Sequence, residues 1–337
     1  MPTPDVAQAR GCVLCGGPLG EAVFQNVRDR LGISDRLWTF RRCRECGSAV
    51  LDPMPSQEEL LTAYPDSYSF GQAPRTHPMH HLLHMLEAHL FYAPLYRHSV
   101  RQVQRVTGLR RGRLLDVGGG TGYRTVFFQR AGFDCVVLEP DERALRVAQE
   151  QFGLKTVSGL LETAELPAGT FDVLTFFAVI EHMPAPLETL KIALRLLRPG
   201  GWIVAMVPIL AGWQAKLGLR WHQVREAPRH VFLPTVEGMS RLLTAAGFEF
   251  RTWEGGNPLD EAGILALSLL PASASAIACA EKRWTLRFGY RLVGAGMTLA
   301  ALPAAYLAYR LGRSSIGVFF AQKSAQSEGN GSIQRTR

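Results

Sequence analysis

The sequence predicts an α/β fold with a doubly wound, mostly parallel sheet. Between residues 113 and 253, apolar runs of strand length alternate with segments of helical periodicity. Such alternation is typical of repeated βαβ units. A glycine-rich turn follows the first run, and a glutamate ends the second. Ligands of these folds bind beyond the carboxyl ends of the strands, so we expect the site at that edge of the sheet.

The elements of this sheet follow in chain order from their apolar runs and end signals. We expect strands at 113–117, 135–139, 171–177, 202–208, 248–253 and 315–323. We expect helices between them at 123–131, 141–152, 186–197 and 234–246. Asp141 is a suitable N-cap for the second helix, while Gly132 and Gly247 end the first and the fourth.

Shorter helices are expected before the sheet. Ser56 and Glu59 have the spacing of a capping box, which predicts a helix that ends near Tyr64. Segment 77–107 has helical spacing and is split by Pro94. Two histidine pairs there have i, i+4 spacing, but no carboxylate or cysteine completes a metal site, so a solvated helix face is the better interpretation.

Composition excludes disorder over most of the chain. Its 337 residues are 47% hydrophobic and 20% charged, which is enough apolar material for a sizeable core. The net charge of +8 suits nucleic acid, an anionic membrane or an acidic small molecule. From residue 271 onward, nine basic and two acidic residues leave +7, so nearly all of the excess is C-terminal.

Four cysteines in two C-x-x-C pairs predict a metal site near the N-terminus. Each pair is followed by a glycine that relieves its turn, and four thiolates satisfy tetrahedral Zn²⁺. The ligands would be Cys12, Cys15, Cys43 and Cys46. Because four thiolates close the coordination sphere, we expect a structural zinc ribbon; free or redox cysteines are the weaker alternative. With a polar N-terminus that lacks a secretory signal, the pairs favour the reducing cytoplasm.

The glycine-rich turn predicts a cofactor site. Its pattern is D-x-G-x-G-x-G, formed by Asp116, Gly118, Gly120 and Gly122. A dinucleotide fingerprint G-x-G-x-x-G would need glycine where Tyr123 stands, which disfavours a nicotinamide or flavin. Glu139 ends the second strand, where a carboxylate can accept both hydroxyls of a ribose. A tight turn beside an incidental acid is the alternative without a ligand.

With these residues in place, the chain resembles the class I S-adenosylmethionine-dependent methyltransferases. This resemblance implies a seven-stranded Rossmann-like sheet. It runs from about residue 113 to 250 and includes the segments 138–141, 159–167, 171–173, 180–182 and 197–201.

The resemblance also implies a set of residues that bind S-adenosylmethionine. Asp116 and the glycines would line its methionine part, with Tyr123 and Pro140 beside the loop, and Glu139 would bind the ribose. Leu161 and Glu162 would lie near the adenine, although Leu160 precedes them where the family more often has glycine. Phe177 and Ala178 would face the methyl group. We interpret Glu181 and His182, which follow, as a polar pair that supports the site, with proton transfer as the alternative.

The order of the segments resembles a bacterial subgroup linked to methylation of sugars, surface polysaccharides or secondary metabolites. The shared features are the ribbon, the segment 51–55, Tyr64 and Tyr68, and a histidine-containing stretch after the strand at 202–208. That stretch holds His222 and His230, which are candidates for removing a proton from the acceptor. Bracing of the loop by either histidine is the alternative, as is packing of the linker by the two tyrosines.

Near the C-terminus, two uncharged runs predict a hydrophobic helical insertion before the last strand. Residues 262–280 and 292–309 are each long enough to cross a bilayer, but Pro271 and Pro303 lie near their centres. A hairpin in the membrane interface fits better, with the basic and aromatic linker 281–291 near lipid headgroups at the inner face. A cap over the acceptor pocket and a dimer interface are the alternatives.

The sequence therefore predicts a methyltransferase of a small or lipid-linked acceptor, with S-adenosylmethionine and structural zinc. The expected organisation is a zinc ribbon at 1–55, a helical linker at 56–110, the catalytic domain at 111–325 with the insertion at 260–312, and a disordered tail at 326–337. One rival is an RNA methyltransferase, which the C-terminal location of the positive charge disfavours. The other is a non-catalytic binding module, which the intact glycine loop disfavours.

Overall fold

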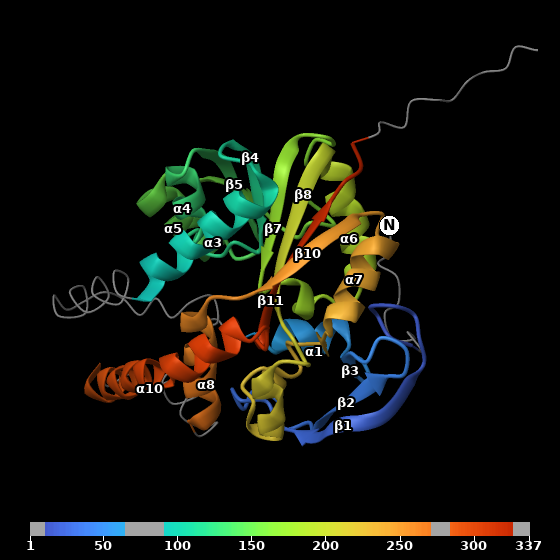
Figure 1. Ribbon diagram of the computed structural model, residues 1–337, viewed down its shortest axis with the longest axis vertical. Coiled ribbons are helices and arrows are strands. Elements are labelled where there is room, and N and C mark those ends of the chain that lie inside the picture. The colour runs from blue at the N-terminus through green and yellow to red at the C-terminus, as the bar shows by residue number, and fades with distance from the viewer. Residues whose placement is uncertain (1–10, 65–90, 271–283, 326–337) are drawn as a thin grey trace, which may run out of the picture.

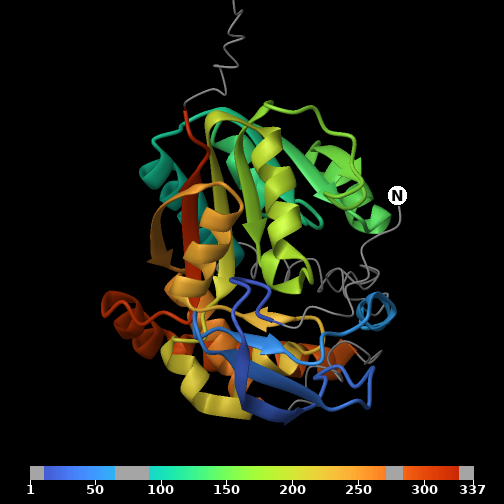
Figure 2. The ribbon, with the colours of Figure 1, turned by 90° about the vertical axis from the view of Figure 1, so that its right-hand side faces the viewer.

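The computed structural model describes residues 11–64, 91–270 and 284–325 (Figure 1). Two sheets organise it. The larger sheet lies between two layers of helices, and the smaller sheet packs below its edge, where Figure 2 shows the N-terminal strands side by side. The predicted histidine pairs, Tyr68, Cys279 and the tail lie outside the described residues.

The larger sheet confirms the predicted fold class. Its seven strands run in the order β10-β11-β8-β7-β4-β5-β6. Its strands are β4 (Gly112–Val117), β5 (Phe133–Glu139), β6 (Lys155–Ser158), β7 (Phe171–Phe177), β8 (Leu197–Pro208), β10 (Glu249–Gly255) and β11 (Ile316–Gln322). The five strands from β8 to β6 are parallel, whereas β11 is antiparallel to both of its neighbours. Among these, β6 was not predicted.

Successive residues of the central strands point to opposite helical layers, as the two-residue period of a strand requires. On β4, Leu114 packs with the layer of α3, α4 and α5, whereas Leu115 packs with that of α6 and α7. Both side chains are fully buried. The helices are α3 (Ala93–Thr107), α4 (Thr125–Arg130), α5 (Glu142–Phe152), α6 (Pro186–Leu196) and α7 (Val236–Ala245).

The expected end signals are confirmed where the structure describes them. Ser56 caps α1 (Gln57–Thr62) and exchanges hydrogen bonds of 3.1 and 2.8 Å with Glu59, which completes the capping box. Asp141 caps α5 by accepting from the Arg143 amide at 2.9 Å. Pro94 lies in the first turn of α3, where its missing N–H costs no hydrogen bond.

A strand from the middle of the chain completes the smaller sheet. Its order is β1 (Leu19–Val27), β2 (Trp38–Cys43), β3 (Ala49–Leu51) and β9 (Phe232–Leu233). β9 follows three short 3₁₀ helices, which are η3 (Ile180–His182), η4 (Trp213–Arg220) and η5 (Val224–Glu226). It pairs antiparallel with β3, which ties the cysteine-containing segment to the loop after β8.

The apolar insertion lies between the last two strands, as predicted. It contains α8 (Pro258–Leu269) and α10 (Trp284–Arg310), which pack on each other and project from the sheet in Figure 1. Glu261 anchors α8, because its buried carboxylate accepts from the Ile316 amide and the Gln214 side chain at 2.9 Å each. Among the described residues, one helix is long and apolar enough to cross a membrane, with mean hydropathy 1.5 over Leu292–Arg310.

Candidate active site

The loop between β4 and α4 has a backbone conformation that residues other than glycine cannot adopt without strain. Gly118, Gly120 and Gly122 have φ values of +65°, +55° and +71°. A Cβ on Gly118 would lie 2.8 Å from a methyl of Val179, and one on Gly122 would lie 2.4 Å from Leu154. The loop is therefore fixed against both the residue before η3 and the segment after α5, with its backbone at the carboxyl edge of the sheet.

Glu139 and the loop hold each other in place. The Gly120 amide donates to Glu139 Oε2 at 3.0 Å, and the Asp141 amide donates to Oε1 at 3.1 Å. Burial raises the pKa of Glu139, whereas these two hydrogen bonds lower it. Each carboxylate oxygen has a second lone pair, so two hydroxyl groups could still donate to Glu139. That is the capacity required to bind a ribose.

Asp116 is buried between the glycine loop and the core of the large sheet. Its side chain is 3% exposed, and it accepts from Thr125 Oγ1 at 2.5 Å and Thr175 Oγ1 at 2.7 Å. Burial raises its pKa, and the two hydroxyl groups oppose that rise. These contacts join β4, β7 and α4, so Asp116 positions the loop from inside the core.

Arg124, which the sequence reasoning missed, lies over Phe177 at the end of β7. Its guanidinium carbon is 4.4 Å from the centroid of the Phe177 ring and 4.9 Å from that of Tyr96. Tyr123 is in edge contact with Tyr96 and with Phe152, at centroid distances of 5.8 and 5.6 Å. An aromatic wall thus borders the loop on the side of α3. No spacing in the sequence could have indicated this contact of Arg124.

Of the two residues expected at the adenine, one is buried in the core and the other is exposed. Leu161 is 3% exposed and belongs to the core beneath α6. Glu162 accepts a hydrogen bond from Thr189 of α6. Pro140 follows β5 and is exposed. Of these three residues, Leu161 is the one that burial shields from a ligand.

The chain turns sharply at Ala178, which brings a polar cluster beside the loop. Ala178 has φ +59°, a conformation that is uncommon for a residue with a Cβ and that concentrates at functional sites. Glu181 and His182 follow on η3, and His182 Nδ1 lies 3.0 Å from Tyr64 Oη. The rings of His182 and His230 are in edge contact at 4.7 Å.

Burial sets the protonation of this cluster. It lowers the pKa of His182 to about 4 and that of His230 well below its usual range, so both imidazoles are neutral at pH 7. It raises the pKa of Glu181 to about 8. The His230 Nδ1–H donates to the Gln223 carbonyl at 3.0 Å. Because a carbonyl only accepts, Nε2 of His230 carries the lone pair.

The structure separates the two histidines predicted to move a proton. His230 joins the cluster beside the loop. His222 belongs to a buried ion-pair network, with Nε2 3.2 Å from Glu226 Oε1. Glu226 also binds Arg30 and Arg229, and this network holds its pKa well below the usual range despite burial.

A family comparison identifies this core. Residues 88–252 match the family described as a methyltransferase domain. The chain therefore contains a class I S-adenosylmethionine-dependent methyltransferase domain. The matched segment contains the glycine loop, Glu139 and the turn at Ala178. It also contains the aromatic residues that border the loop, from Tyr96 to Phe177.

Similar proteins agree with this assignment over part of their length. A ubiquinone biosynthesis O-methyltransferase of Bordetella avium is 31% identical over 108 residues, which cover 30% of this chain and 45% of that protein. An uncharacterized methyltransferase of Mycobacterium sp. (strain KMS) is 34% identical over 100 residues, 29% of this chain and 40% of that protein. The chain thus spans about half or less of the length of the curated relatives it matches.

Solved methyltransferase structures are also similar to this chain. The phosphoethanolamine N-methyltransferase 2 of Haemonchus contortus, in complex with S-adenosyl-L-methionine, has a TM-score of 0.47 at 18% identity, covering 67% of this chain and 52% of that chain.

The cysteine cluster in front of the methyltransferase domain has the geometry of a tetrahedral thiolate site. Cys12 Sγ lies 3.7 Å from Cys46 Sγ, and Cys15 Sγ lies 3.5 Å from Cys43 Sγ. Four sulfurs about 2.3 Å from a zinc ion would be about 3.8 Å apart, so the donor set fits zinc closely. Helix α7 packs directly on the cluster, since a Cβ on Gly238 would lie 3.4 Å from Cys46 Sγ.

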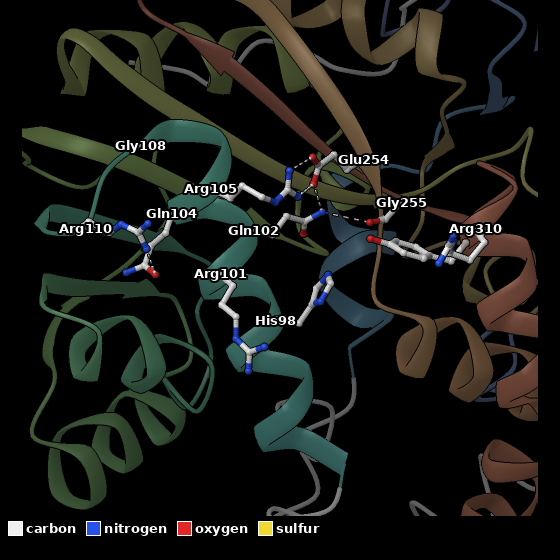
Figure 3. A pocket seen from close by; sticks show the side chains of 11 residues that line it. His98, Arg101, Gln102, Gln104, Arg105, Gly108, Arg110, Glu254, Gly255 and Arg310 are labelled. Carbon is white, nitrogen blue, oxygen red and sulfur yellow. Dashed lines mark hydrogen bonds and ion pairs between the residues drawn. The ribbon is translucent and has the colours of Figure 1, made fainter.

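A separate basic groove opens between α3, β10 and α10 of the methyltransferase domain (Figure 3). Its volume is about 1010 Å³, and its charged lining residues are Arg101, Arg105, Arg110, Glu254 and Arg310. Glu254 accepts from Arg105 at 2.7 Å and from Gln102 at 2.8 Å. Of the described residues that line it, none belongs to the predicted cofactor site.

Proposed function

We propose that this protein transfers the methyl group of S-adenosylmethionine to an oxygen or carbon of a small-molecule or lipid-linked acceptor, with sugars among the candidates. The observation that carries the proposal is the pairing of the glycine loop with Glu139, which leaves carboxylate lone pairs at the carboxyl edge of a methyltransferase domain. The name of the Bordetella avium relative, an O-methyltransferase of ubiquinone biosynthesis, supports a small acceptor.

The chemistry asks little of the protein beyond positioning. S-adenosylmethionine supplies an activated methyl group. The chain must hold a nucleophile in line with the breaking bond, exclude water and accept a proton from a hydroxyl or carbon acid. The neutral imidazoles of His182 and His230 support an acceptor position beside η3. His230 is then the better candidate for proton transfer, because His222 is engaged by Glu226.

Calorimetric titration with S-adenosylmethionine tests the cofactor site. Glu139→Gln should weaken binding by roughly 10–100-fold, the effect of losing charge-assisted hydrogen bonds of about 1.5–3 kcal/mol. Glu142→Gln is the matched control, because Glu142 is an exposed carboxylate three residues along the chain. Absence of binding to the wild-type chain would reject the proposal and favour a non-catalytic module.

We also propose that the four cysteines bind one structural zinc ion. The sulfur spacing and the closed donor set support this, as does the packing of α7 on the cluster. Elemental analysis should find one zinc per chain. Replacing Cys43 with serine should remove it, and an unchanged zinc content would contradict the assignment.

We further propose that α10 rests on an anionic membrane surface. Only 17% of its apolar span is buried, and five side chains along it are 52–59% exposed. They are Leu292, Val293, Leu299, Tyr306 and Leu307. The basic groove of Figure 3 adjoins the same helix through Arg310, where phosphate headgroups would complement its charge. A lipid-linked acceptor would approach the domain from this side.

Partition to anionic liposomes tests the membrane proposal. The double variant Leu299→Glu, Leu307→Glu should lower partition by at least about tenfold, since each buried apolar side chain contributes about 1.5–3 kcal/mol. The control double variant, Ile33→Glu with Leu37→Glu, changes exposed apolar residues of the N-terminal unit and should leave partition unchanged. Equal partition of all three proteins would reject the proposal, and a dimer broken by the α10 variant would assign the surface to a second copy.

A further inference from the structure

Three potential metal ligands meet beside the cofactor loop. One ligand atom each from Glu181, His182 and His230 lies within 4.8 Å of the others. They come from two segments far apart in the sequence, which a hydrogen bond of 2.9 Å from the Val231 amide to the Glu181 carbonyl holds together. A metal about 2.1 Å from each atom would need them roughly 3.4 Å apart, so small side-chain rotations would suffice.

One oxygen of the buried Glu181 carboxyl group lacks the partner that its burial requires. Glu181 is only 1% exposed, and no donor among the residues that the structure describes reaches its Oε2 atom. A buried carboxylate oxygen without a partner is costly, and each such atom in a folded protein calls for an explanation. A cation between Glu181 and the two imidazoles would satisfy it.

Both histidines have the second contact that metal-binding histidines usually have. Nδ1 of His230 donates to the Gln223 carbonyl, which leaves Nε2 with the lone pair that a metal needs. Nδ1 of His182 is in hydrogen-bond contact with Tyr64 Oη, and Nε2 would carry the lone pair when Nδ1 donates that hydrogen bond. Such outer contacts fix the ring and its tautomer and strengthen the ligand.

We propose that Glu181, His182 and His230 form a second metal site, which holds a divalent transition-metal ion and binds an oxygen of the acceptor. Two imidazoles and one carboxylate suit such ions and leave coordination positions open. The position is suitable, because η3 directly follows Val179, which contacts the glycine loop. This role rests on the proposed methyltransferase function. It makes His230 a ligand, and the cation, not His230, would increase the acidity of the acceptor hydroxyl.

A titration of the full chain with Mn²⁺ tests the site. The chain is first given one equivalent of Zn²⁺, which the four thiolates should hold, and free Mn²⁺ is then followed by electron paramagnetic resonance. We expect one Mn²⁺ per chain, and at least a tenfold loss of affinity in Glu181→Gln and His230→Ala. His182→Ala should lose Mn²⁺ affinity by the same factor. Because His182 is partly exposed, this variant is less prone to misfold than the other two. His98→Ala, a histidine of the basic groove, is the matched control.

Either of two results would overturn the metal site. The wild-type chain could bind neither Mn²⁺ nor a second equivalent of Zn²⁺, or all three variants could bind Mn²⁺ as tightly as the wild type. Calorimetry with S-adenosylmethionine on the same samples keeps the two proposals apart. Cofactor binding without Mn²⁺ binding rejects the metal site and leaves His230 as the proton acceptor. Mn²⁺ binding without cofactor binding rejects the methyltransferase function.

Discussion

Arg229 holds three separate segments of the protein together, and its removal should destabilise the fold strongly. The guanidinium is fully buried. Nε donates to Glu226 at 2.9 Å, Nη1 donates to the Ala63 carbonyl at 3.0 Å, and Nη2 donates to Asp29 at 2.7 Å. Arg229→Met keeps most of the volume and removes the charge. Breaking a buried ion pair from one side costs about 3–5 kcal/mol.

The contacts that remain place the expected loss at the lower end of that range. Glu226 keeps Arg30 and His222, so it stays compensated. Asp29 keeps only the amides of Leu31 and Ile33, at 3.0 and 3.1 Å, among the partners that the structure describes. We therefore expect about 3 kcal/mol, most of it from the unpaired Asp29 carboxylate.

Urea unfolding, followed by circular dichroism and tryptophan fluorescence, measures this loss. Adding Asp29→Asn to Arg229→Met should recover about 1–2 kcal/mol, because the remaining buried charge is then gone. Arg241→Met is the control, since Arg241 pairs with Glu237 at the exposed surface and its loss should leave the midpoint unchanged. A change below about 1 kcal/mol in Arg229→Met, or no recovery in the double variant, would refute this reasoning.

Three further predictions follow from single positions. Gly238→Ala places a Cβ 2.1 Å from Ser48 Oγ, so calorimetric unfolding should show a net loss of about 1–2 kcal/mol despite better helix propensity, partly recovered by Ser48→Ala. Gly122→Ala combines φ +71° with a contact of 2.4 Å to Leu154, so it should lower stability by about 2–4 kcal/mol and weaken S-adenosylmethionine binding in calorimetry. Burial raises the pKa of Asp260 from 3.8 to about 6, so its charge destabilises the native state most above pH 6. In urea unfolding, Asp260→Asn should then stabilise the protein by about 1–2 kcal/mol at pH 8 and by about half as much at pH 5. An equal gain at both pH values would contradict a raised pKa of Asp260 in the native state.

Most of the strands that could be predicted are largely buried. Five of the six strands expected in the sheet begin and end within two residues of the observed bounds, since buried strands have continuous apolar sequences. β6 was missed because its four residues, Lys155–Ser158, lie at the edge of the sheet and none of them is buried. β9 has two residues, and only its pairing with β3 makes it a strand.

The cofactor loop could be predicted because its contacts are local. Gly120 and Glu139 lie 19 residues apart in one βαβ unit, so the turn and the end of the next strand must meet. The meeting of His182 with His230 spans 48 residues and depends on the turn at Ala178 and on the backbone contact between Glu181 and Val231. Neither contact has a sequence pattern, so His222 and His230, which lie in one stretch after β8, were predicted together as candidates instead.

Long-range contacts join the cysteine-containing unit to the segment that holds His230. His230 lies two residues before β9, which pairs with β3 directly after the second cysteine pair. At the other end of β9, Thr235 donates to the Cys46 carbonyl at 2.6 Å. Both ends of this short strand are thus fixed by the cysteine unit, whereas the glycine loop is braced by Asp116 within the large sheet. These bonds support the position of His230 and do not touch the cofactor loop. Under the proposed function, loss of zinc from the four cysteines would therefore disturb His230 before it disturbs cofactor binding.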